Sequence, residues 1–171
     1  IADQYPMRVR RITPGGVITT VAGNGISGDT GDGGPALSAS FQDISGLATD
    51  PAGDVYIADA NSERVRKMTI STGTITTVAG TGAFGFSGDG GPATSAKIYN
   101  PAGIAVDAAG ALYIADNGNQ RIRKVAGGII NTIVGSGGSD CSPNGSLLSV
   151  CIAPQGLVVR GSTIVFGEKT R

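Results

Sequence analysis

The sequence repeats itself with an offset of 57 residues, and this period constrains the fold more than any other feature. Gly73–Gly80 repeats the pattern of Gly16–Gly23, and Gly88–Ala93 repeats Gly31–Ala36. A third, eroded copy runs from Ile130 to the C-terminus. A fixed period of this length is typical of architectures in which one supersecondary unit buries its apolar face against the next copy. The period therefore predicts a fold, but it says little about function, because repeat scaffolds carry their specificity in variable loops.

The composition narrows the fold class and removes several function classes. Glycine is abundant, at 29 of 171 residues, but it follows no three-residue period, which excludes a collagen-like chain. Hydrophobic residues make up 40% and charged residues only 15%, so disorder is not expected. Lysine plus arginine equals aspartate plus glutamate, 13 each, so no global field steers the chain to nucleic acid or anionic lipid. No apolar run is long enough to span a membrane. The remaining class is a turn-dense, all-β protein.

Each full copy contains four short segments with strand character, separated by turn residues. Asp50 and Gly53, like Asp107 and Gly110, occupy the first and fourth positions of a type I turn. Four antiparallel strands per repeat predict four-stranded β-propeller blades. The glycine-rich segment at 80–100 then links one outer strand to the next inner strand. The predicted strands are Gly46–Asp50, Asp54–Asp59, Arg64–Thr69 and Thr74–Val78, then Gly103–Asp107, Ala111–Asp116, Arg121–Val125 and Ile129–Val134.

Three motifs between Pro101 and Val125, ahead of the eroded copy, carry a family resemblance. Pro101–Asp107, Leu112–Asp116 and Asn119–Val125 together resemble the NHL repeat. The Gly-Asp-Gly-Gly-Pro-Ala element is similar to a subtype found in bacterial and extracellular proteins and in the teneurin propeller. The resemblance covers essentially the whole chain and weakens after Gly135. It implies a β-propeller, usually of six blades, that binds proteins, glycans or nucleic acid and only occasionally acts as an enzyme.

The predicted organisation is a partial NHL β-propeller over residues 1–171. Blade remnants and repeats cover approximately 1–23, 24–80, 81–135 and 136–171, which gives about three blades of a six-bladed ring. Three explanations remain open. The chain is an excerpt of a longer one whose other blades complete the ring, which we favour because it starts and ends within a blade. Alternatively, two arcs close one ring as a homodimer, or the arc stacks on other proteins.

The glycine-rich loops are candidate calcium or anion sites. Asp29 and Asp32 lie in one flexible loop, as carboxylates in oxygen-ligand calcium sites do, and Asp89 is the equivalent of Asp32 in the next copy. An EF-hand spacing is absent, and no Gly-Lys-Ser or Gly-Lys-Thr motif follows. We favour a structural turn in which the aspartates accept hydrogen bonds from backbone amides.

Basic residues recur on each predicted third strand, and an aspartate precedes the first arginine by five residues in every copy. This spacing predicts hairpin ion pairs that fix the geometry of each blade. The alternative is a basic rim for RNA or another polyanion, which the zero net charge and sparse aromatic residues disfavour. The predicted pairs are Asp3 with Arg8, Asp59 with Arg64, and Asp116 with Arg121.

The two cysteines, Cys141 and Cys151, lie in one loop of the eroded copy. An even, local pair favours a disulfide and an oxidising compartment. Two free thiols are the alternative, with Cys151 serving as a small apolar core residue.

The chain contains no histidine, which removes Ser-His-Asp and Cys-His arrangements from this segment. We expect a non-catalytic, extracellular or periplasmic binding or structural module with no resident metal or cofactor. Its expected partner is a protein or glycan, or the remaining blades. A fragment of a propeller lyase or lactonase with a central metal is the enzymatic alternative.

Overall fold

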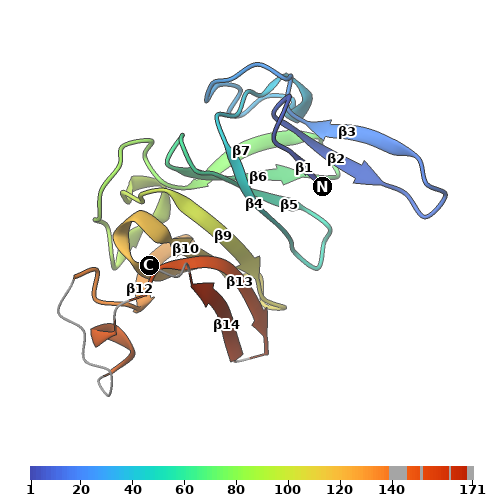
Figure 1. Ribbon diagram of the computed structural model, residues 1–171. Coiled ribbons are helices and arrows are strands. Elements are labelled where there is room, and N and C mark those ends of the chain that lie inside the picture. The colour runs from blue at the N-terminus through green and yellow to red at the C-terminus, as the bar shows by residue number, and fades with distance from the viewer. Residues whose placement is uncertain (139–145, 151, 162, 169–171) are drawn as a thin grey trace.

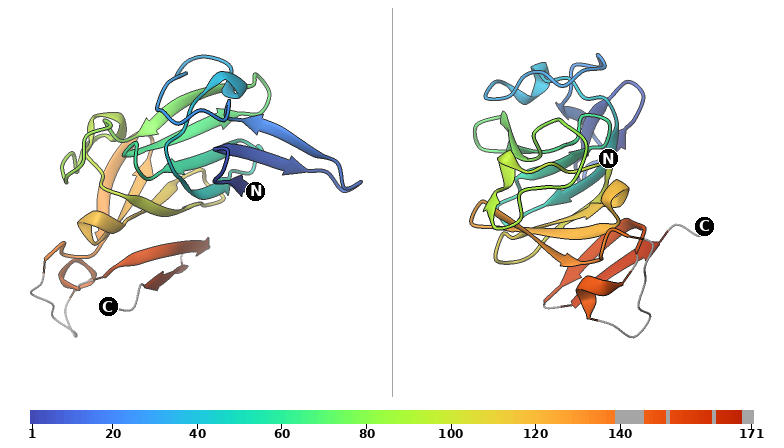
Figure 2. Two further views of the ribbon diagram at one scale, coloured as in Figure 1. Left: turned by 45° about the horizontal axis from the view of Figure 1, so that its top comes forward. Right: turned by 90° about the vertical axis from the view of Figure 1, so that its left-hand side faces the viewer.

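The computed structural model describes residues 1–138, 146–150, 152–161 and 163–168 and shows an all-β chain folded into successive antiparallel sheets (Figure 1). The sheets follow one another along the chain and fan out, as the two further views confirm (Figure 2). We call them blades one to four. The strands are β1 (Ala2–Asp3), β2 (Arg8–Ile12) and β3 (Ile18–Ala22); β4 (Ile44–Thr49), β5 (Val55–Asp59), β6 (Arg64–Thr69) and β7 (Thr74–Ala79); β8 (Gly91–Pro92), β9 (Pro101–Val106), β10 (Leu112–Asp116), β11 (Arg121–Ala126) and β12 (Ile129–Val134); and β13 (Pro154–Arg160) and β14 (Thr163–Glu168).

Helical structure in the described residues is limited to single 3₁₀ turns: η1 (Ala36–Ser38), η2 (Ala93–Ser95), η3 (Asn117–Asn119) and η4 (Leu147–Ser149). No helix there is long and apolar enough to cross a membrane. The all-β propeller-blade class predicted from the repeat is therefore confirmed.

The inner strands β4 and β9 begin two residues earlier than predicted. Ile44 pairs with Asp59, and the register shifts before Gly46, so a bulge at Ser45 lets pairing continue toward the linker. The Ser45 hydroxyl uses this displacement to donate a 2.6 Å hydrogen bond to the Pro101 carbonyl of the next inner strand. The bulge thus links the inner strands of two neighbouring blades.

The glycine-rich linkers, residues 23–43 and 80–100, do more than connect blades. In the second linker, β8 pairs with β12, the outer strand of the blade that follows it. In the first linker, the Gly33 amide donates to the Ile75 carbonyl at 2.8 Å, and the Ile75 amide donates to Gly34 at 3.0 Å. Each linker therefore covers the hydrogen-bonding edge of the next blade, which the sequence did not predict. Such covering protects an exposed strand edge from pairing with another chain.

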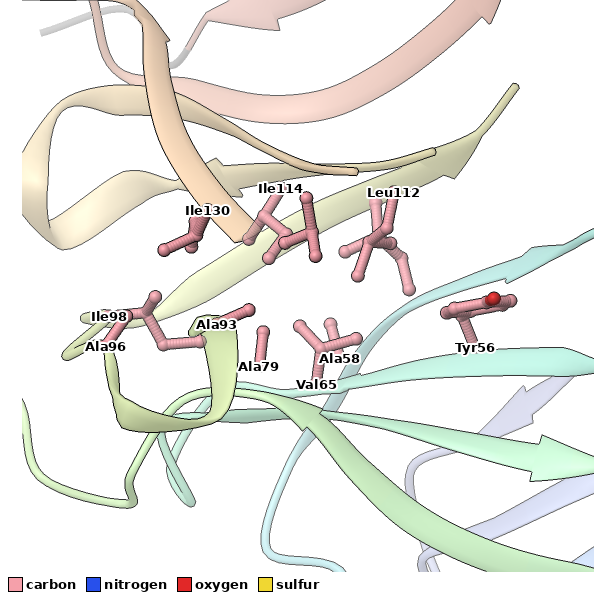
Figure 3. Close-up of a cluster of buried hydrophobic side chains, with 12 residues drawn as sticks. Tyr56, Ala58, Val65, Ala79, Ala93, Ala96, Ile98, Leu112, Ile114 and Ile130 are labelled. Atoms are coloured by element: carbon pink, nitrogen blue, oxygen red, sulfur yellow. The ribbon is translucent and has the colours of Figure 1, made fainter. Parts of the chain in front are cut away.

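The core consists of apolar layers between neighbouring blades. Between blades two and three, Tyr56 and Val65 face Leu112 and Ile114, and Ile98 of the second linker closes one end of the layer (Figure 3). Equivalent layers lie between blades one and two and between blades three and four. Each copy of the repeat thus buries its apolar face against its neighbour, as the period predicts.

Candidate functional site

A buried arginine on the third strand of blade two holds the first linker in place. Arg66 is 1% exposed. Its Nε donates to Asp32 Oδ1 at 2.9 Å, and its terminal nitrogens donate to the carbonyls of Ser40 and Thr30 at 3.0 and 3.1 Å. The other oxygen of Asp32 accepts the Thr77 amide at 2.9 Å. The guanidinium and carboxylate thus bind linker and blade to each other with charge-assisted hydrogen bonds.

Arg123 repeats this arrangement in blade three, with a second carboxylate added. It is fully buried, and it donates to Asp89 Oδ1 at 2.7 Å and to Asp116 Oδ2 at 3.2 Å. It also donates to the carbonyls of Ser87 and Lys97, which correspond to Thr30 and Ser40 in the preceding copy. We call each arrangement an arginine clasp.

Arginines of the protein itself bind the loop carboxylates that were candidate calcium ligands. Asp32 and Asp89 bind the clasp arginines, and Asp29 forms an ion pair with Arg64. Within the part of the chain that the structure describes, no group of three His, Cys, Asp or Glu side chains gathers at one point. The carboxylates of these loops therefore face guanidinium groups of the protein itself.

Several basic residues of the third strands bind groups of the protein itself. Arg66 and Arg123 are buried, and Lys67 reaches Asp50 and Asp54 at 3.0 and 2.8 Å. Arg64 and Arg66, which alternate on one face of β6, both bind linker residues.

The predicted hairpin ion pairs are corrected by the described side chains. Asp59 and Arg64 lie opposite each other in the register of β5 and β6. Arg64 nevertheless pairs with Asp29, and it donates to the Thr81 carbonyl at 3.1 Å. The long arginine side chain extends past its cross-strand neighbour and reaches the linkers. Sequence spacing within one hairpin does not reveal these linker contacts.

The same correction applies in blades one and three. Asp3 lies opposite Arg8, and Asp116 lies opposite Arg121, without an ion pair in either described pair. Each arginine instead donates to the carbonyl of the second residue beyond the outer strand of its blade. These acceptors are Asn24 for Arg8, Thr81 for Arg64 and Ser136 for Arg121.

Asp59 and Asp116 bind backbone amides at the start of the inner strands instead of the arginine directly opposite them in the hairpin. Asp59 is fully buried and accepts the Asp43 amide at 2.8 Å and the Ser62 hydroxyl at 2.7 Å. Asp116 accepts the Tyr99 amide at 2.8 Å. Burial raises the pKa of both carboxyl groups above the usual aspartate value, and these donors offset only part of that effect.

The turn aspartates Asp50 and Asp107 organise the loop between the first two strands of their blades. Asp107 Oδ1 accepts the amides of Ala109 and Ala111 at 3.0 and 2.8 Å, and Oδ2 accepts the Tyr113 hydroxyl at 3.0 Å. Gly110 follows with a φ of 82°, which only glycine adopts readily. Gly53 has the same role in blade two, with a φ of 87°.

We expect Asp107→Asn to make the free energy of unfolding depend less on pH in the acid range. Partial burial pushes the pKa of Asp107 up, but the hydrogen bonds from Ala111, Tyr113 and Ala109 outweigh it and hold the pKa below its usual 3.8. A lowered folded-state pKa stabilises the protein above the unfolded pKa, and this contribution is lost as pH falls through the folded pKa. The variant should lose less than about 1 kcal/mol at pH 7 and then fall less steeply than the parent below about pH 4. Urea unfolding at pH 7, 5 and 3 measures both effects, and parallel acid limbs would contradict the prediction.

The two linkers form the same clasp, but their exposed residues differ. Phe84 and Phe86 take the places of Ser27 and Asp29 in the preceding copy, and Tyr99 replaces Gln42. All three aromatic side chains are exposed, Phe84 most of all. They were not among the predicted site residues. Comparing the two linkers position by position would have shown them.

The predicted disulfide between Cys141 and Cys151 lies outside the described residues.

A family model for the teneurin NHL domain matches residues 83–147. Teneurin-3 of Danio rerio is 39% identical over 142 residues, which covers 75% of this chain and 5% of that protein. Teneurin-4 of Mus musculus is 43% identical over 104 residues, with 53% of this chain and 4% of that protein covered. The chain thus spans a small fraction of the length of these relatives.

Solved structures share the fold. A Bacteroides thetaiotaomicron protein of unknown function is 28% identical with a TM-score of 0.62, covering 77% of this chain and 32% of that one. A streptogramin B lyase structure has a TM-score of 0.57 at 18% identity and covers 94% of this chain and 41% of that one, so it shows the fold alone. The repeat motifs, the four-stranded blades and the teneurin NHL match together place this chain in the NHL-repeat family.

Proposed function

We propose that the protein is a non-catalytic binding module, built on NHL propeller blades, that makes protein–protein or protein–glycan contacts outside the cytoplasm. One observation carries the proposal: two copies of the repeat share the arginine clasp, while the exposed residues of their linkers differ. A rigid frame with variable exposed loops is the usual arrangement of recognition modules.

The use of charge within the blades supports this proposal. Four charged side chains of the blades are buried and hydrogen-bonded to each other or to backbone groups of the same frame: Arg66, Arg123, Asp59 and Asp116. Burial in this frame raises the pKa of the Asp59 and Asp116 carboxyl groups, so these shifts fit a structural role. The teneurin NHL match agrees with a binding role, and the predicted cysteine pair agrees with an oxidising compartment.

A binding screen with two arms tests the proposal. The purified protein is passed over a glycan array and over proteins of the secreted fraction, and hits are measured by biolayer interferometry. We expect at least one saturable interaction with a Kd below about 10 μM that survives EDTA. Heat-denatured protein is the control for non-specific adsorption.

Two results would overturn the proposal in favour of the alternatives. Binding to RNA that weakens steeply between about 50 and 200 mM salt would indicate a polyanion reader. Cleavage of a streptogramin or lactone that EDTA abolishes would indicate a metal-dependent propeller enzyme, in line with the shared fold of the streptogramin B lyase.

A further inference from the structure

Three aromatic side chains of the second linker are exposed to solvent, and we call them together the aromatic shelf. Phe84 is 73% exposed, Tyr99 43% and Phe86 42%. The rings of Phe84 and Tyr99 lie 5.8 Å apart at an interplanar angle of 50°. The chain has only four phenylalanines and four tyrosines, so three of its eight aromatic residues gather here. Exposing aromatic surface costs free energy, so a cluster of this kind marks an interaction site more often than chance.

The preceding copy shows that the frame does not need these rings. Ser27, Asp29 and Gln42 hold the equivalent positions, and the clasp, the linker pairing and the 3₁₀ turn form there as well. Because the same backbone forms with polar residues, the fold does not require Phe84 or Tyr99. Phe86 instead takes the place of Asp29 beside the equivalent arginine, Arg121 in this copy and Arg64 in the preceding one.

The shelf is held in a fixed position. The guanidinium carbon of Arg121 lies 3.8 Å from the Phe86 ring centroid, and that of Arg123 lies 4.8 Å from it. Tyr99 lies against Gly118, where an added Cβ would come within 2.5 Å of the ring. The Asn119 side chain fixes the loop tip by donating to the Gly85 carbonyl at 2.7 Å. A preorganised aromatic surface loses little conformational entropy on binding.

An exposed cation, Lys97, lies beside the shelf. The Lys97 stem passes 3.5 Å from the position of a Cβ on Gly85, between the two phenylalanines in sequence, and Lys97 is exposed with no ion pair to any described residue. The acids nearby are engaged: Asp89 binds Arg123, and Glu63 accepts the Asn100 amide at 2.6 Å. In the preceding copy the positions of Phe86 and Lys97 hold an aspartate and a serine. The second linker has therefore lost a negative charge and gained a positive one.

We propose that the aromatic shelf with Lys97 docks a segment of a partner protein that carries an acidic side chain next to apolar ones. This inference rests on the proposed binding function and names its surface. Phenylalanine, tyrosine and arginine are the residues that enrich the centres of protein interfaces. The tilt between Phe84 and Tyr99 presents an edge beside a face, which suits an inserted side chain better than a flat sugar ring lying across both. Lys97 supplies the complementary charge at the rim.

Peptide selection with matched variants tests the inference. A random phage-displayed dodecapeptide library is panned on the protein, with counter-selection on F84A/Y99A, and enriched peptides are measured by fluorescence polarisation. The control is I26A, which removes an exposed apolar side chain from the equivalent linker. Thermal melts confirm that all variants fold, which the exposure of Phe84 and Tyr99 favours.

We expect enriched peptides that pair Asp or Glu with apolar residues. Their affinity should fall by about tenfold or more in F84A/Y99A, fall in K97E, and remain unchanged in I26A. Peptides that bind all variants equally would show that the aromatic shelf is not the docking surface. They would leave the proposed binding function intact. An absence of shelf-dependent peptides, or shelf-dependent binding confined to acidic glycans on an array, would also overturn the inference.

Discussion

Replacing Arg123 by methionine is expected to destabilise the protein by about 3–5 kcal/mol, the usual cost of removing one partner from a buried ion pair. The substitution leaves Asp116 fully buried without its guanidinium and removes the donors to Asp89 and Ser87. Methionine fills much of the same volume, so the loss reports on charge and hydrogen bonding more than on a cavity. The pKa of Asp116, already raised by burial, should rise further because the positive charge beside it is gone.

Urea unfolding followed by circular dichroism measures this change, with Arg11→Met as the control. Arg11 lies on β2 and is exposed, so its replacement should change the free energy of unfolding by less than about 0.5 kcal/mol. Arg66→Met should fall between the two, because its partner Asp32 is partly exposed and regains water. Equal effects of Arg123→Met and Arg11→Met would show that the clasp contributes nothing to stability.

Gly80→Ala is expected to cost about 2–5 kcal/mol, from backbone strain and steric overlap together. Gly80 has a φ of 92°, and a Cβ there would lie 2.2 Å from the Glu63 carbonyl oxygen and 3.1 Å from the Arg64 Cα. Both neighbours are backbone atoms of the β5–β6 hairpin, so no side-chain rotation relieves the overlap. The glycine that ends each Thr-Val-Ala-Gly motif is therefore required by the close approach of two backbone segments.

Gly73→Ala separates strain from overlap. Gly73 also has a positive φ, 69°, but no atom lies within 4 Å of the position of its Cβ. We expect this variant to lose about 1–2 kcal/mol, from the left-handed conformation alone. Thermal melts of both variants give the comparison, and a Gly80→Ala protein as stable as Gly73→Ala would contradict the proposed overlap.

The sequence predicted the strands well because each depends on local information. Hairpin turns with Asp50–Gly53 and Asp107–Gly110 and the apolar alternation act within about ten residues, and the repeat shows the same local pattern a second time. The start of β4 was placed two residues late because a bulge leaves no signal in the alternation.

The partners of the charged side chains were not predictable in the same way. Arg66 meets Asp32 across 34 residues, and Arg123 meets Asp89 across the same separation. Pairing by proximity in sequence favoured Asp59 with Arg64, whose backbones do pair. Which of several arginines reaches which carboxylate depends on how the linker folds back over the blade, and that is a tertiary property.

Each glycine-rich linker is bonded to the blade that follows it, so linker and blade together form one structural unit of this chain. Because Asp32 and Asp89 precede the strands whose arginines they bind, the segment that gains and loses order together begins at the linker and ends with the outer strand. An N-terminal truncation that begins the chain at Gly80 would remove only complete units, so no clasp arginine that remains would lose its carboxylate partner. An N-terminal truncation at Asn100 would keep Arg123 but discard Asp89 and the carbonyls of Ser87 and Lys97, which leaves Asp116 to hold the guanidinium without the linker. Modular recombination of such arrays should therefore cut ahead of the glycine-rich segment.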